Sequence, residues 1–335
     1  MLYVTTQSAD NPATAQRVLG ENRAEDGGLY LPFRNPRFSR EDLDKLFQMP
    51  FGERIAQILN LLFQTKISGW DVDFCIGRRP IRLSSLRHRI VMAECWHNPD
   101  WEYLHTVRNL LQLLKTQTDV ISGWPAIAVR IALLFAVFGE LRQTGIQRAD
   151  VSCVSGDLSL AVSAWYAREW GLPIGNIVIC SNENNQLWEL VYHGQLRTDA
   201  VSIPTILPET DEVLPVNLER LIYSCSDRKE VLRFRKTARL GQLYTVDDLI
   251  RSKLQEGLSV SVVSSDRLFD TVRGAYRTHG YVLAPSAALA YAGLLDYRAK
   301  SGASGHALVI SEKSPALDPD FIRYSVGISY EDLKK

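Results

Sequence analysis

At residues 151–193 the sequence reads Val151-Ser152-Cys153-Val154, a helical segment over Ser159–Trp170, then Asn176-Ile177-Val178-Ile179-Cys180-Ser181 and a second helical segment over Glu183–His193. Short β-branched runs that alternate with helices are typical of βαβ units, which build a parallel sheet with helices on both faces. Further apolar runs follow at Ala200–Ile206, Ser259–Val263 and His306–Ser311. The sequence therefore predicts an α/β fold with a largely parallel sheet.

The length and charge of the chain limit the number of domains and the classes of partner that we expect. Its 335 residues suit one large α/β domain or two ordinary ones. Lys plus Arg and Asp plus Glu are both 38, so the formal net charge is zero. No global field then attracts nucleic acid or an anionic membrane. We therefore expect neither nucleic acid nor a membrane among the partners.

Cysteine usage and the N-terminus favour a cytoplasmic protein. The five cysteines lie far apart and form no Cys-x-x-Cys pair, which favours reduced, buried thiols. The start of the chain lacks the basic residues and the apolar run of a signal peptide. The longest apolar stretch, Trp124–Phe138, contains Arg130 and is shorter than the roughly 20 residues that span a bilayer. We expect a buried core helix there.

Local signals predict several helices outside the alternating region. Ser39 precedes two acidic residues and predicts a capped helix, as does Thr245-Val246-Asp247-Asp248. Phe51–Phe63 carries apolar residues at helical spacing. The arginines between Gly69 and Arg89 could hold a phosphate ester, but scattered arginines more often cover a solvated face, and we favour that interpretation.

Four short segments follow one another along the chain. They read Asp26-Gly27-Gly28-Leu29-Tyr30, Tyr166-Ala167-Arg168-Glu169-Trp170-Gly171-Leu172-Pro173-Ile174, Ser181-Asn182-Glu183-Asn184 and Asn217-Leu218-Glu219-Arg220-Leu221. They resemble the threonine synthase motifs Asp-Gly-Gly-Leu-Tyr, Tyr-Ala-Lys-x-Met-Gly-Leu-Pro-Ile, Thr-Asn-Glu-Asn and Asn-Phe-Glu-Arg-Leu. The resemblance covers most of residues 3–323. It implies the large domain of the fold type II pyridoxal-phosphate enzymes and a link to amino-acid metabolism.

The segment Val91–Leu111 resembles the threonine synthase segment that carries the Schiff-base lysine, Leu-Glu-Leu-Phe-His-Gly-Pro-Thr-Leu-Ala-Phe-Lys-Asp-Phe. When His97 and Pro99 are aligned with the family's His and Pro, the lysine position falls on Leu104 and the following aspartate on His105. An aldimine with pyridoxal phosphate needs an amine, which leucine lacks. The resemblance therefore implies that the ancestral cofactor chemistry has been lost, and we expect no cofactor.

Other motifs of the cofactor site are also altered. Ser155-Gly156-Asp157 stands where the family's Thr-Gly-Asn-Phe-Gly-Asn loop binds the cofactor phosphate, and we interpret Asp157 as satisfying N–H groups that begin a helix. Ser286 replaces a family histidine, and Glu312 replaces the threonine that bonds the pyridine nitrogen. The candidates for a vestigial pocket are His97, Leu104, His105, Ser155, Gly156, Asp157, Ser286, Glu312 and Lys313. We assign no catalytic residue and, with no His-x-x-x-His pair, no metal site.

The resemblance implies a small domain for which the sequence leaves little room. Only Gln112–Asp119 separates the equivalent of the lysine helix from Val120–Arg130, which resembles the segment where the family returns from its small domain. We expect that domain to be deleted or reduced, which opens the site to water. Residues 1–111 then form a threonine-synthase-like N-terminal segment and residues 112–335 an α/β core domain, with the two packing as one unit.

Three functions remain open. The leading hypothesis is a pseudoenzyme with a binding, regulatory or assembly role. The alternative is a divergent enzyme, a carbon–oxygen lyase acting on a phosphorylated amino acid, with Lys313 or a partner's lysine as the amine. The third is a subunit whose homodimer or protein partner covers surface that the missing domain exposes. A small anionic ligand is compatible with each.

Overall fold

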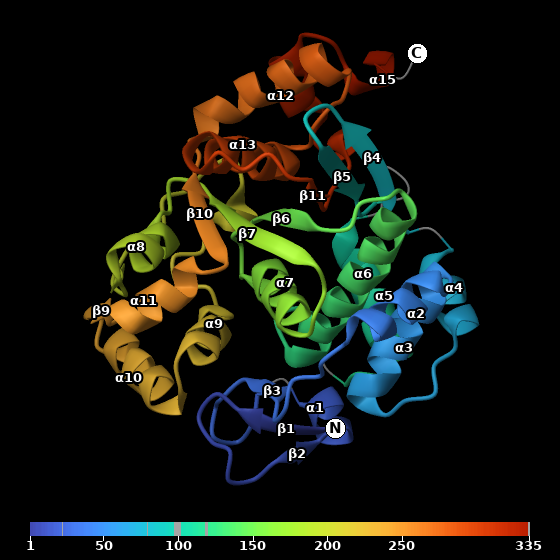
Figure 1. Ribbon diagram of the computed structural model, residues 1–335. Helices are drawn as coiled ribbons and strands as arrows, with labels where there is room; N and C mark the ends of the chain where they lie inside the picture. Colours follow the sequence, from blue (N-terminus) through green and yellow to red (C-terminus); the bar gives the residue numbers. More distant parts are fainter. Residues whose placement is uncertain (22, 79, 97–101, 118–119, 334–335) are drawn as a thin grey trace.

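The centre of the molecule is a six-stranded sheet in the order β10-β7-β6-β11-β5-β4 (Figure 1). The computed structural model describes residues 1–21, 23–78, 80–96, 102–117 and 120–333. β5 to β7, β10 and β11 run parallel, and β4 is antiparallel to β5. The strands are β4 (Arg82–Leu86), β5 (Ile90–Glu94), β6 (Ala149–Val154), β7 (Ile174–Ser181), β10 (Leu258–Val262) and β11 (Ala307–Ser311). The prediction of a largely parallel α/β sheet is confirmed.

Helices cover both faces of this sheet, because its strands are apolar on both sides. In β5, Val91 and Ala93 face one core and Ile90 and Met92 face the other. The first core packs against α3 (Phe51–Phe63), α6 (Trp124–Gln143) and α7 (Ser159–Glu169), and the second against α12 (Ser265–His279) and α13 (Pro285–Ser301). Figure 1 shows the two helix layers on opposite sides of the strands. A continuous apolar pattern in each strand is what a sheet buried on both faces requires.

The apolar stretch that begins at Trp124 forms α6. Among the described residues, α6 is the one helix long and apolar enough to cross a bilayer, but 94% of its most apolar window is buried inside the protein. Pro125 lies in its first turn, where a missing N–H costs nothing. The prediction of a buried core helix is confirmed.

Smaller elements surround the central sheet. An N-terminal sheet has the order β2-β1-β3, and β8 pairs with β9. The strands are β1 (Leu2–Thr5), β2 (Ala13–Thr14), β3 (Tyr30–Pro32), β8 (Gln195–Arg197) and β9 (Leu243–Thr245). The remaining α-helices are α1 (Ala15–Gly20), α2 (Arg40–Gln48), α4 (Gly69–Ile76), α5 (Tyr103–Leu113), α8 (Gln186–His193), α9 (Leu218–Cys225), α10 (Arg228–Arg239), α11 (Asp248–Gln255), α14 (Pro319–Val326) and α15 (Tyr330–Leu333). The predicted caps are confirmed: Ser39 accepts from the N–H of Asp42, and Asp247 from that of Ile250.

The predicted apolar run at Ala200–Ile206 is not a strand, and this expectation was wrong. The segment is an irregular loop whose Val201 and Ile203 side chains are exposed. Polar side chains hold it instead of a neighbouring strand. The N–H of Ile203 donates to Oδ1 of Asn184 at 2.8 Å, and Nδ2 of Asn182 donates to Oγ1 of Thr205 at 2.9 Å. The Asn182-Glu183-Asn184 motif thus fixes the loop that leads toward the cavity described below.

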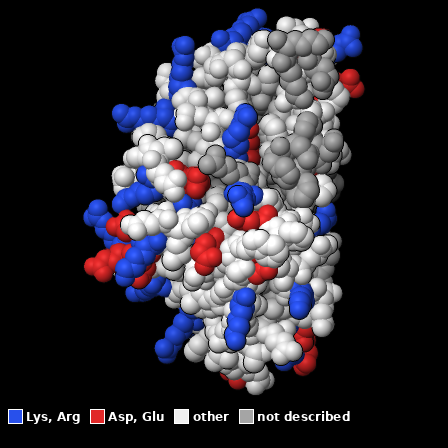
Figure 2. Space-filling view, turned by 90° about the vertical axis from the view of Figure 1, so that its right-hand side faces the viewer, with Lys and Arg blue, Asp and Glu red and all other residues white. Residues whose placement is uncertain are grey.

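The link between α5 and α6 is short. It runs over residues 114–123, of which 118 and 119 lie outside the described residues. β4 and β5, which precede residue 111, hydrogen-bond within the same sheet as strands that follow it. The surface on one side of the molecule carries basic and acidic side chains intermingled, in keeping with the zero net charge (Figure 2).

Candidate functional site

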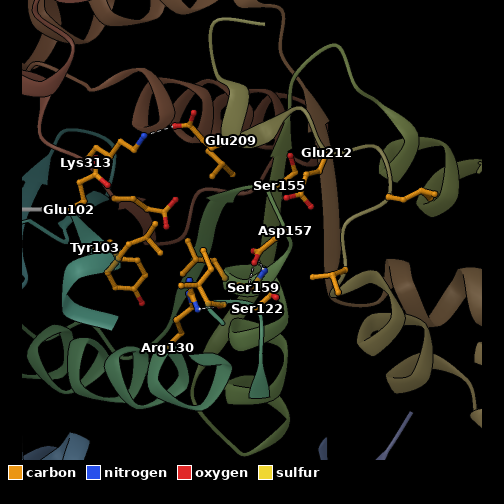
Figure 3. A pocket seen from close by; sticks show the side chains of 18 residues that line it. Glu102, Tyr103, Ser122, Arg130, Ser155, Asp157, Ser159, Glu209, Glu212 and Lys313 are labelled. Carbon is orange, nitrogen blue, oxygen red and sulfur yellow. Dashed lines mark hydrogen bonds and ion pairs between the residues drawn. The ribbon is translucent and has the colours of Figure 1, made fainter. Parts of the chain in front are cut away.

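A cavity of about 490 Å³ lies where the carboxyl ends of neighbouring strands meet. Its wall includes residues that follow β5, β6 and β11, together with the loop at Glu209–Val216. Open parallel sheets bind their ligands beyond the carboxyl ends of the strands, because the connecting loops diverge there. Figure 3 shows charged side chains from several of these segments around one space. The cavity is the candidate site.

The structure gathers most of the candidate residues in this wall. Leu104, Ser155, Gly156, Asp157, Glu312 and Lys313 all line the cavity. His105 and Ser286 are not among its lining residues: His105 is exposed, and its Nδ1 accepts from the N–H of Glu102 at 3.1 Å, while Ser286 is buried in the first turn of α13. His97 lies outside the described residues.

The turn between β6 and α7 carries its own carboxylate at the start of the helix. Oδ1 of Asp157 accepts the N–H of Ser159 at 2.8 Å, and Oδ2 accepts the Ser159 hydroxyl at 2.7 Å (Figure 3). Gly156 has φ +42°, and Leu158, which is fully buried, adopts a left-handed φ of 63°. Asp157 therefore satisfies a helix N–H as expected, although Leu158 occupies the N-cap position.

A second family-like motif anchors this turn. Nδ2 of Asn217 donates to the main-chain oxygen of Asp157 and to Oγ of Ser159, each at 3.1 Å. Arg220, fully buried, donates through Nε to the carbonyl of Tyr30 and through Nη1 to that of Ser122, both at 3.0 Å. The Asn217–Leu221 segment thus ties the N-terminal sheet and the start of α6 to the cavity floor. Its role here is structural.

Lys313 is the one lysine of the cavity wall within the described chain. Its Nζ lies 3.1 Å from Oε1 of Glu209, an ion pair drawn at the edge of the cavity in Figure 3. Burial is the largest single influence and lowers the pKa of Lys313, but Glu209, assisted by Glu102 and Asp318, outweighs it, so this pKa lies above its usual value. Lys313 is therefore an ammonium at neutral pH and a poor nucleophile.

Glu312 is the most perturbed acid of the wall. Burial, assisted by Asp157 and Glu209 and opposed by the Arg130 guanidinium, raises its pKa to about 7. The side chain has no ion pair or hydrogen bond within the described part of the protein. Its carboxyl group is thus close to half ionised near neutral pH.

Two buried polar atoms of the wall lack partners. Ser155 and Arg130 are 6% and 3% exposed, and neither Oγ of Ser155 nor Nε of Arg130 has a hydrogen-bond partner among the described residues. Nη1 of Arg130 donates to the carbonyl of Ile121 at 2.8 Å, and its guanidinium lies 6.0 Å from the Tyr103 ring centre. Buried polar groups are normally paired, so unpaired ones in a cavity indicate a place for a ligand.

Some residues of the wall were not predicted as site residues. Arg130 lies in the segment that resembles the family's return from its small domain, so that resemblance was the signal available for it. Glu209 and Glu212 follow the irregular loop 198–207, whose apolar residues show neither helix nor strand spacing, so the sequence carried no signal for them. Glu102 and Tyr103 begin α5 directly before Leu104.

Comparison with known proteins identifies the relatives of this chain. Residues 2–78 match the family described as threonine synthase N terminus. Human threonine synthase-like 1 is 26% identical over 145 residues, which cover 42% of this chain and 19% of the human protein. Threonine synthase of Pseudomonas aeruginosa is 23% identical over 171 residues, covering 50% of this chain and 36% of that protein. The chain spans about a fifth of the length of the threonine synthase-like 1 proteins it matches.

The fold agrees with the sequence matches. Yeast threonine synthase superposes with a TM-score of 0.87 at 16% identity, covering 100% of this chain and 93% of that one. The N-terminal residues match the threonine synthase family, and the chain has the fold of the threonine synthases. The Brucella melitensis threonine synthase, solved with pyridoxal phosphate bound, gives a TM-score of 0.84 at 18% identity and covers 98% of this threonine synthase-like chain and 92% of its own. The resemblance seen in the four sequence motifs is confirmed.

Proposed function

We propose that this chain is a non-catalytic, cytoplasmic threonine synthase-like protein that binds a small ligand without covalent pyridoxal phosphate. The observation that carries the proposal is the chemistry of the amines in the cavity. Leu104, at the aligned lysine position, contributes a hydrocarbon to the wall, and the ammonium of Lys313 is engaged by Glu209. Covalent attachment of an aldehyde needs an unprotonated amine, and the described wall offers none.

The turn at Asp157 argues against binding of the cofactor's phosphate. The resemblance puts that phosphate at the N-terminus of α7, where free N–H groups and the helix dipole favour an anion. Here the Asp157 carboxylate already accepts the N–H and the hydroxyl of Ser159. A phosphate dianion would lose those donors and meet a like charge. These residues do not fit pyridoxal phosphate.

The test is reconstitution of the full chain with pyridoxal phosphate. We expect no aldimine absorbance band and no lysine modified after borohydride reduction, as located by peptide mass spectrometry. Leu104→Lys is the matched variant: treated with phosphate-free pyridoxal, it should yield a reduced adduct at position 104. An adduct on a native lysine in the unaltered protein would overturn the proposal.

The alternative is a divergent enzyme that acts on a phosphorylated amino acid. It requires Lys313 or a lysine from a partner to act as the amine. Two observations favour the non-catalytic role. The raised pKa of Lys313 keeps its amine protonated, and the acidic wall repels a phosphorylated substrate. Phosphate released from O-phosphohomoserine above the rate without protein, and lost in Lys313→Arg, would establish the alternative.

We also propose that two copies of the chain associate. The link between α5 and α6 is short, and we infer that the small domain that the resemblance predicts next to the site is deleted or reduced. The stacked rings of Trp70 and Phe74 are 69% and 81% exposed on α4, which packs against α5. Aromatic pairs that are exposed in a single chain are typical of surfaces that a protein partner covers. Light scattering at micromolar concentration should give the mass of a dimer, and a monomer mass contradicts this part of the proposal.

A further inference from the structure

The charge of the cavity is opposite to that expected for a phosphate-binding site. Its wall contains five carboxylates, from Glu102, Asp157, Glu209, Glu212 and Glu312, and two cations, Arg130 and Lys313. Lys313 is neutralised by Glu209, and Arg130 is held by the carbonyl of Ile121. The excess of negative charge repels phosphates and attracts cations.

Two groups on neighbouring strand ends face this space without partners. Ser155 directly follows β6 and Glu312 directly follows β11, and these two strands are neighbours in the central sheet. Adjacent strands are about 4.8 Å apart. Ser155 is nine-tenths buried, yet its Oγ lacks a hydrogen bond within the described chain, as does the Glu312 carboxyl group. A single donor group between them would satisfy both.

We propose that the cavity binds a small organic cation through an ammonium group placed between Ser155 and Glu312, with Glu212 adding attraction from the mouth. This inference rests on the proposed non-catalytic function and names its class of ligand. An ammonium carries three N–H donors and a full charge, which match a hydroxyl oxygen and a carboxylate. The cavity, at about 490 Å³, lies within the range of small-molecule sites, roughly 300–1,000 Å³.

A metal ion is a poorer occupant of the same space. Among the described residues, no three His, Cys, Asp or Glu side chains are grouped so that they could hold a metal. Divalent cations need several oxygen ligands converging at about 2.0–2.6 Å, whereas an ammonium tolerates carboxylates spread around a larger cavity. The dispersed acids of this wall therefore favour an organic amine.

The experiment is calorimetric titration of the full chain at pH 8 and low salt. The probes are 1,4-diaminobutane, n-butylamine, inorganic phosphate and magnesium chloride. We expect both amines to bind, and phosphate and magnesium to give no binding heat. Glu312→Gln should weaken diamine binding by about ten-fold because it removes the charge that attracts the ammonium, and Ser155→Ala by several-fold because it removes one acceptor. Glu41→Gln, which changes the net charge equally on an exposed face of α2, should leave the affinity unchanged.

The outcomes separate this inference from the proposed function. Thermal unfolding of each variant without ligand identifies any loss of fold, and retention of amine affinity in a folded Glu312→Gln variant overturns the inference. Absence of amine binding to the unaltered protein also overturns it. Phosphate binding that is tighter than amine binding overturns it as well, because the cavity would then prefer anions. An aldimine formed with added pyridoxal phosphate defeats the non-catalytic function as well. Without an aldimine, the failure belongs to the ligand class alone.

Discussion

Nζ of Lys313 lies 3.1 Å from Oε1 of Glu209, so the described lysine of the cavity wall is paired before any ligand arrives. Both side chains are about one-third exposed, which makes the pair weak in energy but sufficient to set the protonation of the amine. The proximity of a lysine to an inherited cofactor site is therefore not evidence of Schiff-base chemistry in this chain.

Glu209→Ala should make Lys313 more reactive. Without the carboxylate, burial is the main influence left on Lys313 and its pKa falls. An exposed pair of this kind contributes roughly 0.2–1 kcal/mol, so we expect about a 1.5- to 5-fold faster acetylation of Lys313 by acetic anhydride at pH 8. The rate is measured by peptide mass spectrometry. Glu209→Ala combined with Lys313→Arg should return the rate to background, and an unchanged rate in the single variant contradicts the role of the pair.

Asp157→Ala should destabilise the protein through the start of α7. The variant removes the acceptor of the Ser159 N–H, a loss of about 1 kcal/mol for a helix terminus. Urea unfolding followed by circular dichroism gives the free energy. Inorganic phosphate should raise the melting temperature of Asp157→Ala and not that of the unaltered protein, since the freed N–H groups can then donate hydrogen bonds to an anion. Equal effects of phosphate on both proteins would show that Asp157 does not fill the anion position.

Glu312 should make stability fall as the pH rises. Its folded-state pKa of about 7 lies above the usual 4.5, so the native protein holds a proton that the unfolded chain releases between these values. Stability from this group is thus full below about pH 4.5 and lost as the pH passes through 7. The facing groups are Arg130 from α6, Asp157 and Glu209 from loops, Lys313 beside it, and the neutral side chains of Cys95, Tyr103 and Cys153.

The variant Glu312→Gln isolates this contribution. Relative to the unaltered protein, it should gain about 1–3 kcal/mol between pH 5 and pH 8, since each pKa unit corresponds to about 1.4 kcal/mol. Urea unfolding at several pH values measures the difference. A difference that does not change with pH would mean that the carboxyl group titrates normally.

Arg220→Ala should strongly destabilise the framework. The guanidinium is fully buried, and burial lowers its pKa to about 10. Its removal leaves the carbonyls of Tyr30 and Ser122 without these donors, at a cost of about 3 kcal/mol or more. Arg239→Ala, on the exposed end of α10, is the control and should cost less than about 0.5 kcal/mol. Similar unfolding free energies for the two variants would contradict the anchoring role.

Much of the fold was predictable because its signals are local. The alternation over 151–193 yields β6, α7, β7 and α8, and Ser39 and Asp247 begin helices through short-range hydrogen bonds. The run at Ala200–Ile206 misled because apolar composition does not reveal that Asn182 and Asn184 hold it as a loop. The loop is held by side chains about twenty residues earlier in the chain, and the spacing of apolar residues does not reveal such contacts.

The site was predictable only as far as the resemblance reached. Six candidate residues line the cavity, five because they directly follow β6 or β11 and Leu104 because it lies in the first turn of α5. Its charge was not predictable, because Glu209 and Glu212 come from an irregular segment and enter the wall through tertiary folding. For that reason our proposal favours a cationic ligand over the small anionic ligand that the sequence left open.

The carboxylate of Asp157 places a negative charge of the protein itself at the N-terminus of α7. Under the proposed non-catalytic function, a chain that completes this helix from its own side chains does not depend on vitamin supply to reach its native state. Its abundance in a cell starved of vitamin B6 should therefore match that in a replete one.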